Sequence, residues 1–418
     1  MNILVVGQGG REHALVTALA ESASAPQLFA WPGSDAIAET ATLLQAEDLP
    51  SLIATMKSHE IDLCVAGEES WLVKDEGLSA TCAAAGIPCW GPPKESAQLE
   101  ASKWFAKEFM VRHDIPTGAC SRVGSLEEAR AAITKYPVVL KFDGLAAGKG
   151  VAVCADEAEA EAFLDEVYLA KRFGEAPVLV EECLEGPEVS IFCAVSNGEY
   201  QILAPARDYK RIADGDEGPN TGGMGAVAGR DLITPELLAE IEETAVARTV
   251  AGLGKDGLPY CGFLYFGFML TPDGPKMLEY NCRFGDPECQ AVMPLVDGDL
   301  AEYVAAGAKG QLKPELLRFH DGWSVCLVLA SKGYPASSHS GDLISGLNEV
   351  TNARVYHAGT RKTSSGDGYE TAGGRVLAVV ARGATREEAV ENAYAQSQKI
   401  DFDGCQRRSD VGRLHFEA

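Results

Sequence analysis

Glu279 and Asn281 are the first residues of this chain whose types and spacing suggest chemistry. They lie two positions apart in an apolar run with the alternation of a β-strand, so both side chains project from the same face. One carboxylate and one amide oxygen on one face suit Mg²⁺ held against phosphate groups. Arg283, two residues further on, can bind a carboxylate or a phosphate through two parallel hydrogen bonds. The alternative is a surface hairpin with solvated ends, but the Gly, Asp, Pro and Glu residues that follow favour a binding site.

Two predicted strands position these residues. Residues 262–270 and 276–280 are apolar runs, and the Thr-Pro-Asp-Gly sequence at 271–274 predicts a turn that joins them as a hairpin.

A glycine-rich loop at residues 142–150 is a second candidate site. It lies between expected strands at 136–141 and 151–154, and its backbone amides could wrap a polyphosphate. It does not match the P-loop, because Gly150 replaces Ser or Thr and a strand rather than a helix follows. A plain flexible hairpin is possible, but Lys141 and Lys149 at its two ends favour a flap over nucleotide phosphates.

The N-terminus offers a third candidate site. An apolar strand at residues 3–6 runs into Gly7-Gln-Gly-Gly10 and then a helix, and such a turn is a ready anion site. Glu12 stands where the third glycine of the dinucleotide fingerprint belongs, which argues against a dehydrogenase. Arg11 in the first helical turn opposes the helix dipole, so it either faces an anion or is simply solvated.

Further elements alternate along the chain. In the first hundred residues, strands at 28–31, 63–66 and 88–90 alternate with helices at 49–58 and 75–85, which predicts a parallel sheet. Later strands are expected at 178–182, 189–195, 323–330, 354–357 and 375–380, and helices at 102–113, 234–252 and 385–400. Residues 214–225 are rich in turn formers and predict a long loop.

Composition narrows the class of protein. The 418 residues are 46% hydrophobic and 23% charged, as in a soluble globular protein of about three domains. A net charge of −25 disfavours nucleic acid and anionic membranes, so a phosphate site must be locally basic or built from backbone N–H groups. The 12 cysteines are scattered singly and are expected to be small core residues in a reducing cytosol. No signal peptide or membrane helix is evident.

Four motifs carry a family resemblance: Gly9-Gly-Arg-Glu-His-Ala14, Gly144-Leu-Ala-Ala-Gly-Lys-Gly150, Gly218-Pro-Asn-Thr-Gly-Gly-Met-Gly225 and Glu279-Tyr-Asn-Cys-Arg-Phe-Gly-Asp-Pro-Glu288. In this order, the chain resembles the glycinamide ribonucleotide synthetase (phosphoribosylamine–glycine ligase) family of ATP-grasp enzymes over essentially its whole length. The resemblance implies an α/β fold with an N-terminal parallel-sheet domain, a two-part ATP-grasp unit with a mobile subdomain, and a small C-terminal α+β domain. The implied boundaries are 1–101 for the N-terminal domain, 102–120 with 185–321 for the main ATP-grasp domain, 121–184 for its lid, and 322–418 for the C-terminal domain.

The resemblance also implies a reaction. Glycine would attack the γ-phosphoryl group of ATP to give glycyl phosphate and ADP. The amine of 5-phospho-β-D-ribosylamine would then displace phosphate and form N1-(5-phospho-β-D-ribosyl)glycinamide, a step of de novo purine biosynthesis. Phosphoryl transfer needs positioning and charge neutralisation more than an acid–base pair. The expected cofactor is Mg²⁺ or Mn²⁺, and the expected protein is a cytoplasmic monomer or weak dimer without nucleic-acid or membrane partners.

The family pattern assigns roles to individual residues of this sequence. Glu279 and Asn281 would hold the metal, Arg283 the glycine carboxylate, and Asp208 the glycine ammonium. Gly9, Gly10 and Arg11 would hold the 5′-phosphate of the amine. The remaining candidates, all on the ATP side or in the glycine-rich loops, are Lys103, Lys141, Gly144, Gly148, Lys149, Gly150, Glu181, Glu182, Leu184, Glu188, Asn220, Gly222 and Gly223.

The chain departs from the family's usual motifs at residues 34, 68–71 and 207–209. The first two departures lie at strand ends facing the expected amine pocket. An alternative is therefore another ATP-grasp carboxylate–amine ligase with a different amine substrate. A nucleotide-binding module without catalysis is a third reading, which loss of a metal ligand or flap lysine would support; none is lost.

Overall fold

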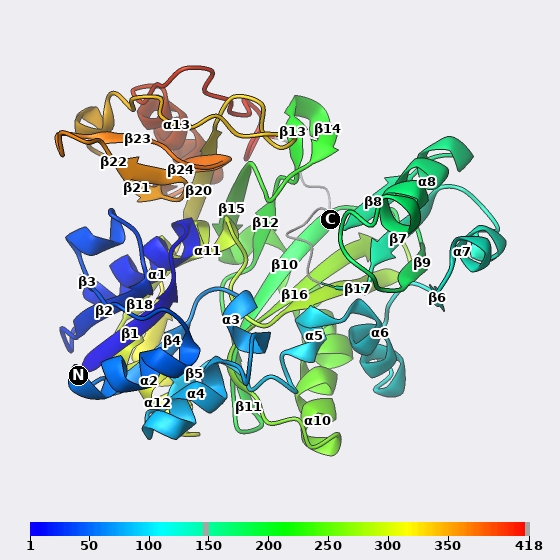
Figure 1. The fold of residues 1–418 in the computed structure, drawn as a ribbon, viewed down its shortest axis with the longest axis horizontal. Helices are drawn as coiled ribbons and strands as arrows, with labels where there is room; N and C mark the ends of the chain where they lie inside the picture. The colour runs from blue at the N-terminus through cyan, green and yellow to red at the C-terminus, as the bar shows by residue number, and fades with distance from the viewer. Residues whose placement is uncertain (145–149, 414–418) are drawn as a thin grey trace.

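The N-terminal domain is a five-stranded parallel sheet with strand order β3-β2-β1-β4-β5 (Figure 1). The computed structural model describes residues 1–144 and 150–413. The continuous apolar run of β1 is buried on both faces, as a central parallel strand requires. The strands are β1 (Asn2–Gly7), β2 (Gln27–Pro32), β3 (Thr42–Leu43), β4 (Leu63–Ala66) and β5 (Cys89–Trp90). The helices are α1 (Gly10–Ala20), α2 (Leu49–Ser58), α3 (Ser70–Val73) and α4 (Leu78–Ala85).

A second sheet forms the lobe on the right of Figure 1. Its four antiparallel strands have the order β6-β9-β7-β8. They are β6 (Cys120–Val123), β7 (Val138–Phe142), β8 (Val151–Cys154) and β9 (Val178–Glu182), with helices α7 (Leu126–Ala132) and α8 (Glu157–Leu164). Helices α5 (Gln98–Ala101) and α6 (Lys103–Arg112) lead into this lobe from the N-terminal domain.

The central sheet has nine strands and runs β17-β16-β10-β12-β15-β20-β24-β21, with β11 paired to β10. Its first part consists of β10 (Glu188–Ser196), β11 (Glu199–Ile202), β12 (Ala206–Asp208), β15 (Gly225–Gly229), β16 (Cys261–Thr271) and β17 (Gly274–Asn281). Its last part consists of the C-terminal strands β20 (Trp323–Ala330), β21 (Arg354–His357) and β24 (Arg375–Gly383). The C-terminal strands therefore continue the central sheet, because β20 pairs with β15 from Gly225↔Leu327 to Gly229↔Trp323.

Smaller elements complete the fold. Two-stranded sheets pair β13 (Arg211–Ala213) with β14 (Glu217–Asn220), β18 (Val296–Gly298) with β19 (Leu317–Phe319), and β22 (Thr360–Lys362) with β23 (Tyr369–Thr371). The remaining helices are α9 (Pro235–Ile241), α10 (Ala247–Lys255), α11 (Glu288–Val292), α12 (Leu300–Ala308) and α13 (Arg386–Ser397). The long loop predicted at 214–225 is shorter in the structure, because Glu217–Asn220 pair with Arg211–Ala213 as a hairpin.

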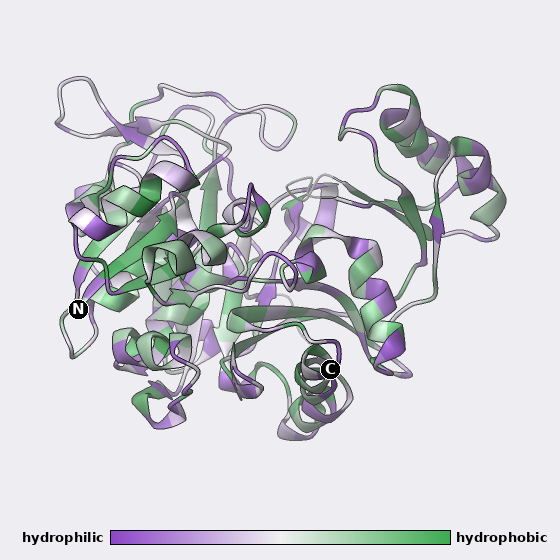
Figure 2. Ribbon diagram, turned by 60° about the horizontal axis from the view of Figure 1, so that its bottom comes forward, coloured by the Kyte–Doolittle hydropathy of each residue, from purple (hydrophilic) through white to green (hydrophobic). Residues whose placement is uncertain are grey.

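The buried apolar side chains form a continuous body and a separate lobe. One cluster includes Ile3 of β1, Phe192 of β10 and Ala378 of β24, so the N-terminal, central and C-terminal parts share a core. The lobe has its own cluster around Leu140 and Val180. Figure 2 shows the green apolar strands inside the body and inside the lobe. The lobe therefore packs around an apolar core of its own.

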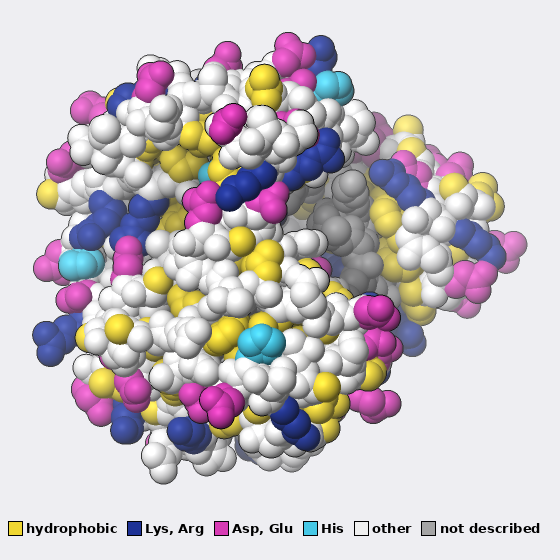
Figure 3. All heavy atoms as spheres, turned by 60° about the vertical axis from the view of Figure 1, so that its left-hand side comes forward, with side chains coloured by type: hydrophobic (Ala, Val, Ile, Leu, Met, Phe, Trp, Pro, Cys, Tyr) yellow, Lys and Arg dark blue, Asp and Glu magenta, His cyan; other side chains and the backbone are white. Residues whose placement is uncertain are grey.

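The surface is mixed in charge. Figure 3 shows acidic and basic side chains interspersed over the face that it draws. Within the described residues, no helix is both long enough and apolar enough to cross a membrane.

Candidate active site

Two adjoining cavities of about 330 and 400 Å³ lie where the lobe, the central sheet and the N-terminal domain meet. Lys141, Asp208 and Glu279 line both cavities, so the two form one continuous site. The first cavity extends towards the N-terminal domain and the second towards the end of β9.

Glu279 and Asn281 lie on the same side of β17 and line the first cavity. Tyr280 between them points the other way into the core, where its hydroxyl lies 2.8 Å from Thr249 Oγ1. The Asn281 amide satisfies both of its polar atoms when its nitrogen donates to Glu100 Oε1 and Tyr280 O, each 3.1 Å away. In that orientation the amide oxygen is available as a ligand beside the Glu279 carboxylate, and such a donor set fits Mg²⁺.

Two lysines bring positive charge to the cavity. Lys103 opens α6, whose N-cap Ser102 accepts a hydrogen bond from Phe105 N at 3.1 Å. Lys103 Nζ donates to Gly144 O at 2.9 Å, and burial lowers the pKa of Lys103. Lys141 on β7 forms a buried ion pair with Glu181 Oε2 at 2.9 Å.

The ion pair at Glu181 keeps both partners charged. Lys107 Nζ lies 3.3 Å from the same Glu181 oxygen. Burial would raise the pKa of Glu181, but Lys141 and Lys107 hold it below its usual value. Glu279 also raises the pKa of Lys141, which is therefore a cation between two carboxylates.

The second cavity has an apolar wall and a polar rim. Met269, Met277 and Leu278 form the apolar wall. Glu182, the last residue of β9, and Leu184, two residues further on, line the same cavity. This composition suits a flat heterocycle whose edge meets backbone groups. Glu188 at the rim forms an ion pair with Lys210, and Asn220 lies there as well.

A buried acidic group lies behind this rim. Lys210 Nζ is 3.7 Å from Asp208 Oδ1, and Glu288 Oε1 accepts a hydrogen bond from Ser190 Oγ at 3.2 Å. Burial and the nearby Asp208 raise the pKa of Glu288 to about 7. Burial likewise raises the pKa of Asp208. The group offers carboxylates that can accept a proton or bind an ammonium.

Arg283 is held by two acidic residues of other segments. Its Nε lies 3.1 Å from Glu69 Oε2 and its Nη2 lies 2.5 Å from Glu100 Oε1. Burial raises the pKa of Glu69, but Arg283 and Arg11 outweigh burial and lower it to about 2. Burial dominates at Glu100 and raises its pKa to about 7. Arg283 therefore enters the first cavity already oriented by protein carboxylates.

The solvated alternative for Arg11 is wrong, because the residue is buried and its anionic neighbours are carboxylates of the protein. The side chain is 6% exposed, and its Nε lies 2.6 Å from Glu12 Oε1. Its Nη2 lies 3.4 Å from Glu69 Oε2, and its Nη1 donates to Phe284 O at 3.2 Å. Arg11 thus ties α1 to the segment after β17, and it lines the first cavity.

The two glycines before Arg11 are closely packed. The Gly9 amide donates to Glu12 Oε2 at 2.7 Å. A Cβ on Gly10 would lie 2.8 Å from Gln290 Nε2, so a side chain there would force the Gln290 amide to move.

A C-terminal arginine completes the first cavity. Arg375 at the start of β24 donates to Gly222 O and to Asp286 O, and its Nη2 lies 3.0 Å from Asp286 Oδ2. Gly223 has φ of +107°, and a Cβ there would lie 2.4 Å from Pro287 Cδ. The segment that contains Gly222 and Gly223 is therefore held between Arg375 and the residues that follow β17.

Most of the predicted site residues converge on the two cavities. Gly144 and Gly150 line the first cavity, whereas Gly148 and Lys149 lie outside the described residues. Gly9, Gly10 and Gly223 support the walls and do not line either cavity. Sequence reasoning did not select several charged residues that line the first cavity, among them Glu69, Glu100, Lys210, Glu288 and Arg375. Glu69, Lys210 and Glu288 lie in or beside segments that the sequence analysis had linked to the site and could have been found, whereas Glu100 and Arg375 have no local signal.

Comparisons with known proteins match successive parts of the chain to the domains of one family. Family models described as the N domain, the ATP-grasp (A) domain and the C domain of phosphoribosylglycinamide synthetase match residues 1–100, 101–289 and 324–414. The chain is 44% identical to a phosphoribosylamine–glycine ligase of Phenylobacterium zucineum, over 99% of both chains. It is 43% identical to one of Caldanaerobacter subterraneus, over 98% of this chain and 99% of the relative.

Solved structures show the same relationship. The phosphoribosylamine–glycine ligase of Thermotoga maritima superposes with a TM-score of 0.85 at 34% identity, covering 98% of this chain and 100% of that one. The biotin carboxylase of Campylobacter jejuni shares the fold with a TM-score of 0.72 at 18% identity, over 97% of this chain and 92% of that one.

Proposed function

The chain belongs to the phosphoribosylglycinamide synthetase family, and we propose that its two adjoining cavities ligate glycine to 5-phospho-β-D-ribosylamine with ATP. The observation that carries the proposal is the convergence of Glu279, Asn281, Lys103 and Lys141 on one cavity beneath the lid. Four residues from three separate elements supply the donors and charges that phosphoryl transfer requires.

The ATP side is assigned to the second cavity and the adjoining part of the first. Adenine would lie on the apolar wall, with its edge on the backbone of residues 181–184 and its ribose hydroxyls on Glu188. The phosphates would extend to Lys103 and Lys141 under the loop that Gly144 and Gly150 flank; Gly148 and Lys149 belong to the same proposal. Mg²⁺ or Mn²⁺, held by Glu279 and Asn281, would neutralise the phosphate charge when bound.

The glycine site lies between Arg283 and Asp208. A glycine carboxylate oxygen attacks the γ-phosphorus while the bond to the β-phosphate oxygen breaks, and ADP leaves. Arg283 would orient the carboxylate, and Asp208 would accept hydrogen bonds from the glycine ammonium. Because Glu69 and Glu100 fix the Arg283 guanidinium, it needs little reorganisation to act.

The amine completes the reaction from the N-terminal side. Its nitrogen attacks the carbonyl carbon of glycyl phosphate, phosphate leaves, and the nitrogen loses a proton. Gly9, Gly10 and Arg11 would hold the 5′-phosphate. An arginine guanidinium has five N–H groups, and three of those of Arg11 already bind the protein. The other two would donate to the phosphate. Asn220, Gly222 and Gly223 would close the wall that faces the leaving phosphate.

The wider setting is part of the same proposal. We expect a cytoplasmic monomer or weak dimer, with an N-terminal domain of 1–101, a main domain of 102–120 and 185–321, a lid of 121–184 and a C-terminal domain of 322–418. The separate apolar core of the lid supports its treatment as a moving part.

The test is an assay of ADP release with each substrate omitted in turn. Phosphoribosylamine is generated in the assay, because the amine is labile. The expected result is rapid ADP release only when ATP, glycine and the amine are all present, with formation of the glycinamide ribonucleotide. Equal rates with an unrelated amine would contradict the assigned substrate.

A further inference from the structure

Three cysteines that are far apart in the sequence meet in the N-terminal domain. The sulfur atoms of Cys64, Cys82 and Cys89 all lie within 4.8 Å of one another. Cys64 on β4 and Cys89 on β5 are direct partners in the parallel register, and Cys82 comes from α4. Figure 1 shows these three elements side by side. Among the described residues, this is the one group of three or more cysteine, histidine or acidic side chains close enough to bind a common metal ion.

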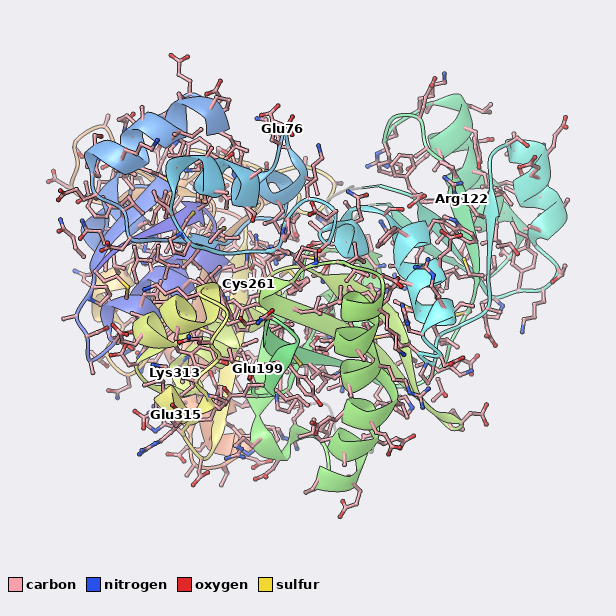
Figure 4. All side chains as sticks on the ribbon, turned by 90° about the horizontal axis from the view of Figure 1, so that it is seen from below. Glu76, Arg122, Glu199, Cys261, Lys313 and Glu315 are labelled. Atoms are coloured by element: carbon pink, nitrogen blue, oxygen red, sulfur yellow. The ribbon has the colours of Figure 1, made fainter. Side chains whose placement is uncertain are left out.

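The thiols have a route to solvent. Cys64 and Cys82 are fully buried, whereas Cys89 is partly exposed and lines a cavity of about 970 Å³. This cavity lies between the N-terminal domain, α10 and the turn after β10, away from the candidate active site. Cys261 lines it as well, and Figure 4 labels Cys261 where the N-terminal domain meets the central sheet. An ion could therefore enter beside Cys89 without crossing the core.

We propose that Cys64, Cys82 and Cys89 form a binding site for one thiophilic divalent metal ion of the zinc and cadmium class. Thiolate sulfur is the ligand that such ions prefer, and a Zn–S distance of about 2.3 Å places three sulfurs roughly 3.8 Å apart. Because the three sulfur atoms lie within 4.8 Å of one another, they need to approach by at most about 1 Å to reach that value. A water molecule from the cavity completes the fourth position.

Binding is coupled to protons. Cysteine thiols have an ordinary pKa of about 8.5, so the trio is protonated near neutral pH when no metal is bound. Each divalent ion exchanges for three protons and leaves a complex with one negative charge. Affinity therefore increases steeply with pH.

The test uses Cd²⁺ alone as the probe on the full-length protein, reduced with a phosphine and freed of metals. Thiolate coordination gives an ultraviolet charge-transfer band, which oxygen ligands such as Glu279 do not produce. We expect the band to saturate at one Cd²⁺ per chain, with release of about three protons. If Cd²⁺ added to the metal-free protein produces no such band, the proposal is overturned.

Two serine variants localise the site. Loss of a residue that only supports a metal ligand weakens metal binding by roughly 10–100-fold. Cys89→Ser removes a ligand itself, so it should weaken Cd²⁺ binding by more than that. Cys261→Ser is the matched control, because it removes a thiol from the same cavity but outside the trio, and it should bind Cd²⁺ unchanged. A band that survives in Cys89→Ser, or that falls equally in both variants, contradicts the assignment. If a melting experiment shows that the Cys89 variant does not fold, Cys82→Ala is measured in its place. It should lose the band, whereas Cys261→Ser should keep it.

Discussion

Replacing Arg11 by Met separates two roles of the same side chain. Met keeps most of the apolar volume but leaves Glu12, which is 2% exposed, without its partner. Removing one member of a buried ion pair costs about 3–5 kcal/mol, so the variant should unfold at clearly lower urea concentration. If Arg11 also binds the phosphate of the amine, loss of that contact, worth about 1.5–3 kcal/mol, should raise KM for the amine roughly tenfold to 150-fold.

A second substitution distinguishes the two effects. Glu12→Gln removes the stranded charge yet keeps an oxygen that can accept from the Gly9 amide. The Arg11→Met/Glu12→Gln double variant should therefore recover stability while its KM for the amine stays high and its KM for ATP stays normal. Urea unfolding and steady-state kinetics measure both quantities. A folded double variant with a normal KM for the amine refutes the phosphate assignment. An Arg11→Met variant that unfolds at the same urea concentration as the wild type refutes the stabilising role of the buried Arg11–Glu12 ion pair.

Three further predictions concern the rest of the site. Glu279→Gln should abolish turnover without changing the melting temperature, because it removes the charged ligand of the proposed metal site; near-normal activity at saturating Mg²⁺ would exclude that role. Glu100 has a pKa of about 7 against an ordinary 4.5, so its contribution to stability is complete below about pH 4.5 and is lost as pH rises through 7. Glu100→Gln should therefore lose less stability than the wild type between pH 5 and 8 in urea unfolding, and an identical pH dependence would contradict this. Arg375→Met removes charge-assisted hydrogen bonds to the Gly222 segment and Asp286, so kcat should fall about tenfold or more while ATP binding by calorimetry is kept; an unchanged kcat would show that the clamp is dispensable.

Local patterns predicted the elements around the site well. The strands at 63–66 and 178–182 and the helix at 49–58 have the predicted bounds, because apolar runs and caps are local signals. The pairing of β15 with β20 was not predictable in this way. It joins residues about a hundred positions apart, and nothing in either strand specifies its neighbour.

The same limit applies to the site. Glu279 and Asn281 could be placed together, since the period of a strand decides which side chains share a face. The carboxylates that hold Arg283 come from residues 69 and 100, and only tertiary packing brings them there. The cysteine trio is the clearest case. The sequence shows single cysteines, and the parallel register of β4 and β5 together with α4 makes them neighbours.

The shared sheet has a consequence for how the protein is made. During translation, β12 and β15 leave the ribosome with one edge of β15 unpaired until β20 follows, and Arg375 at the cavity arrives later still with β24. The lining of the first cavity is thus complete only when almost the entire polypeptide has been made. A nascent chain that stalls near residue 320 presents a bare strand edge, which is a template for pairing with another unfinished chain. Steady elongation through the last hundred residues therefore protects against aggregation as well as completing the catalyst.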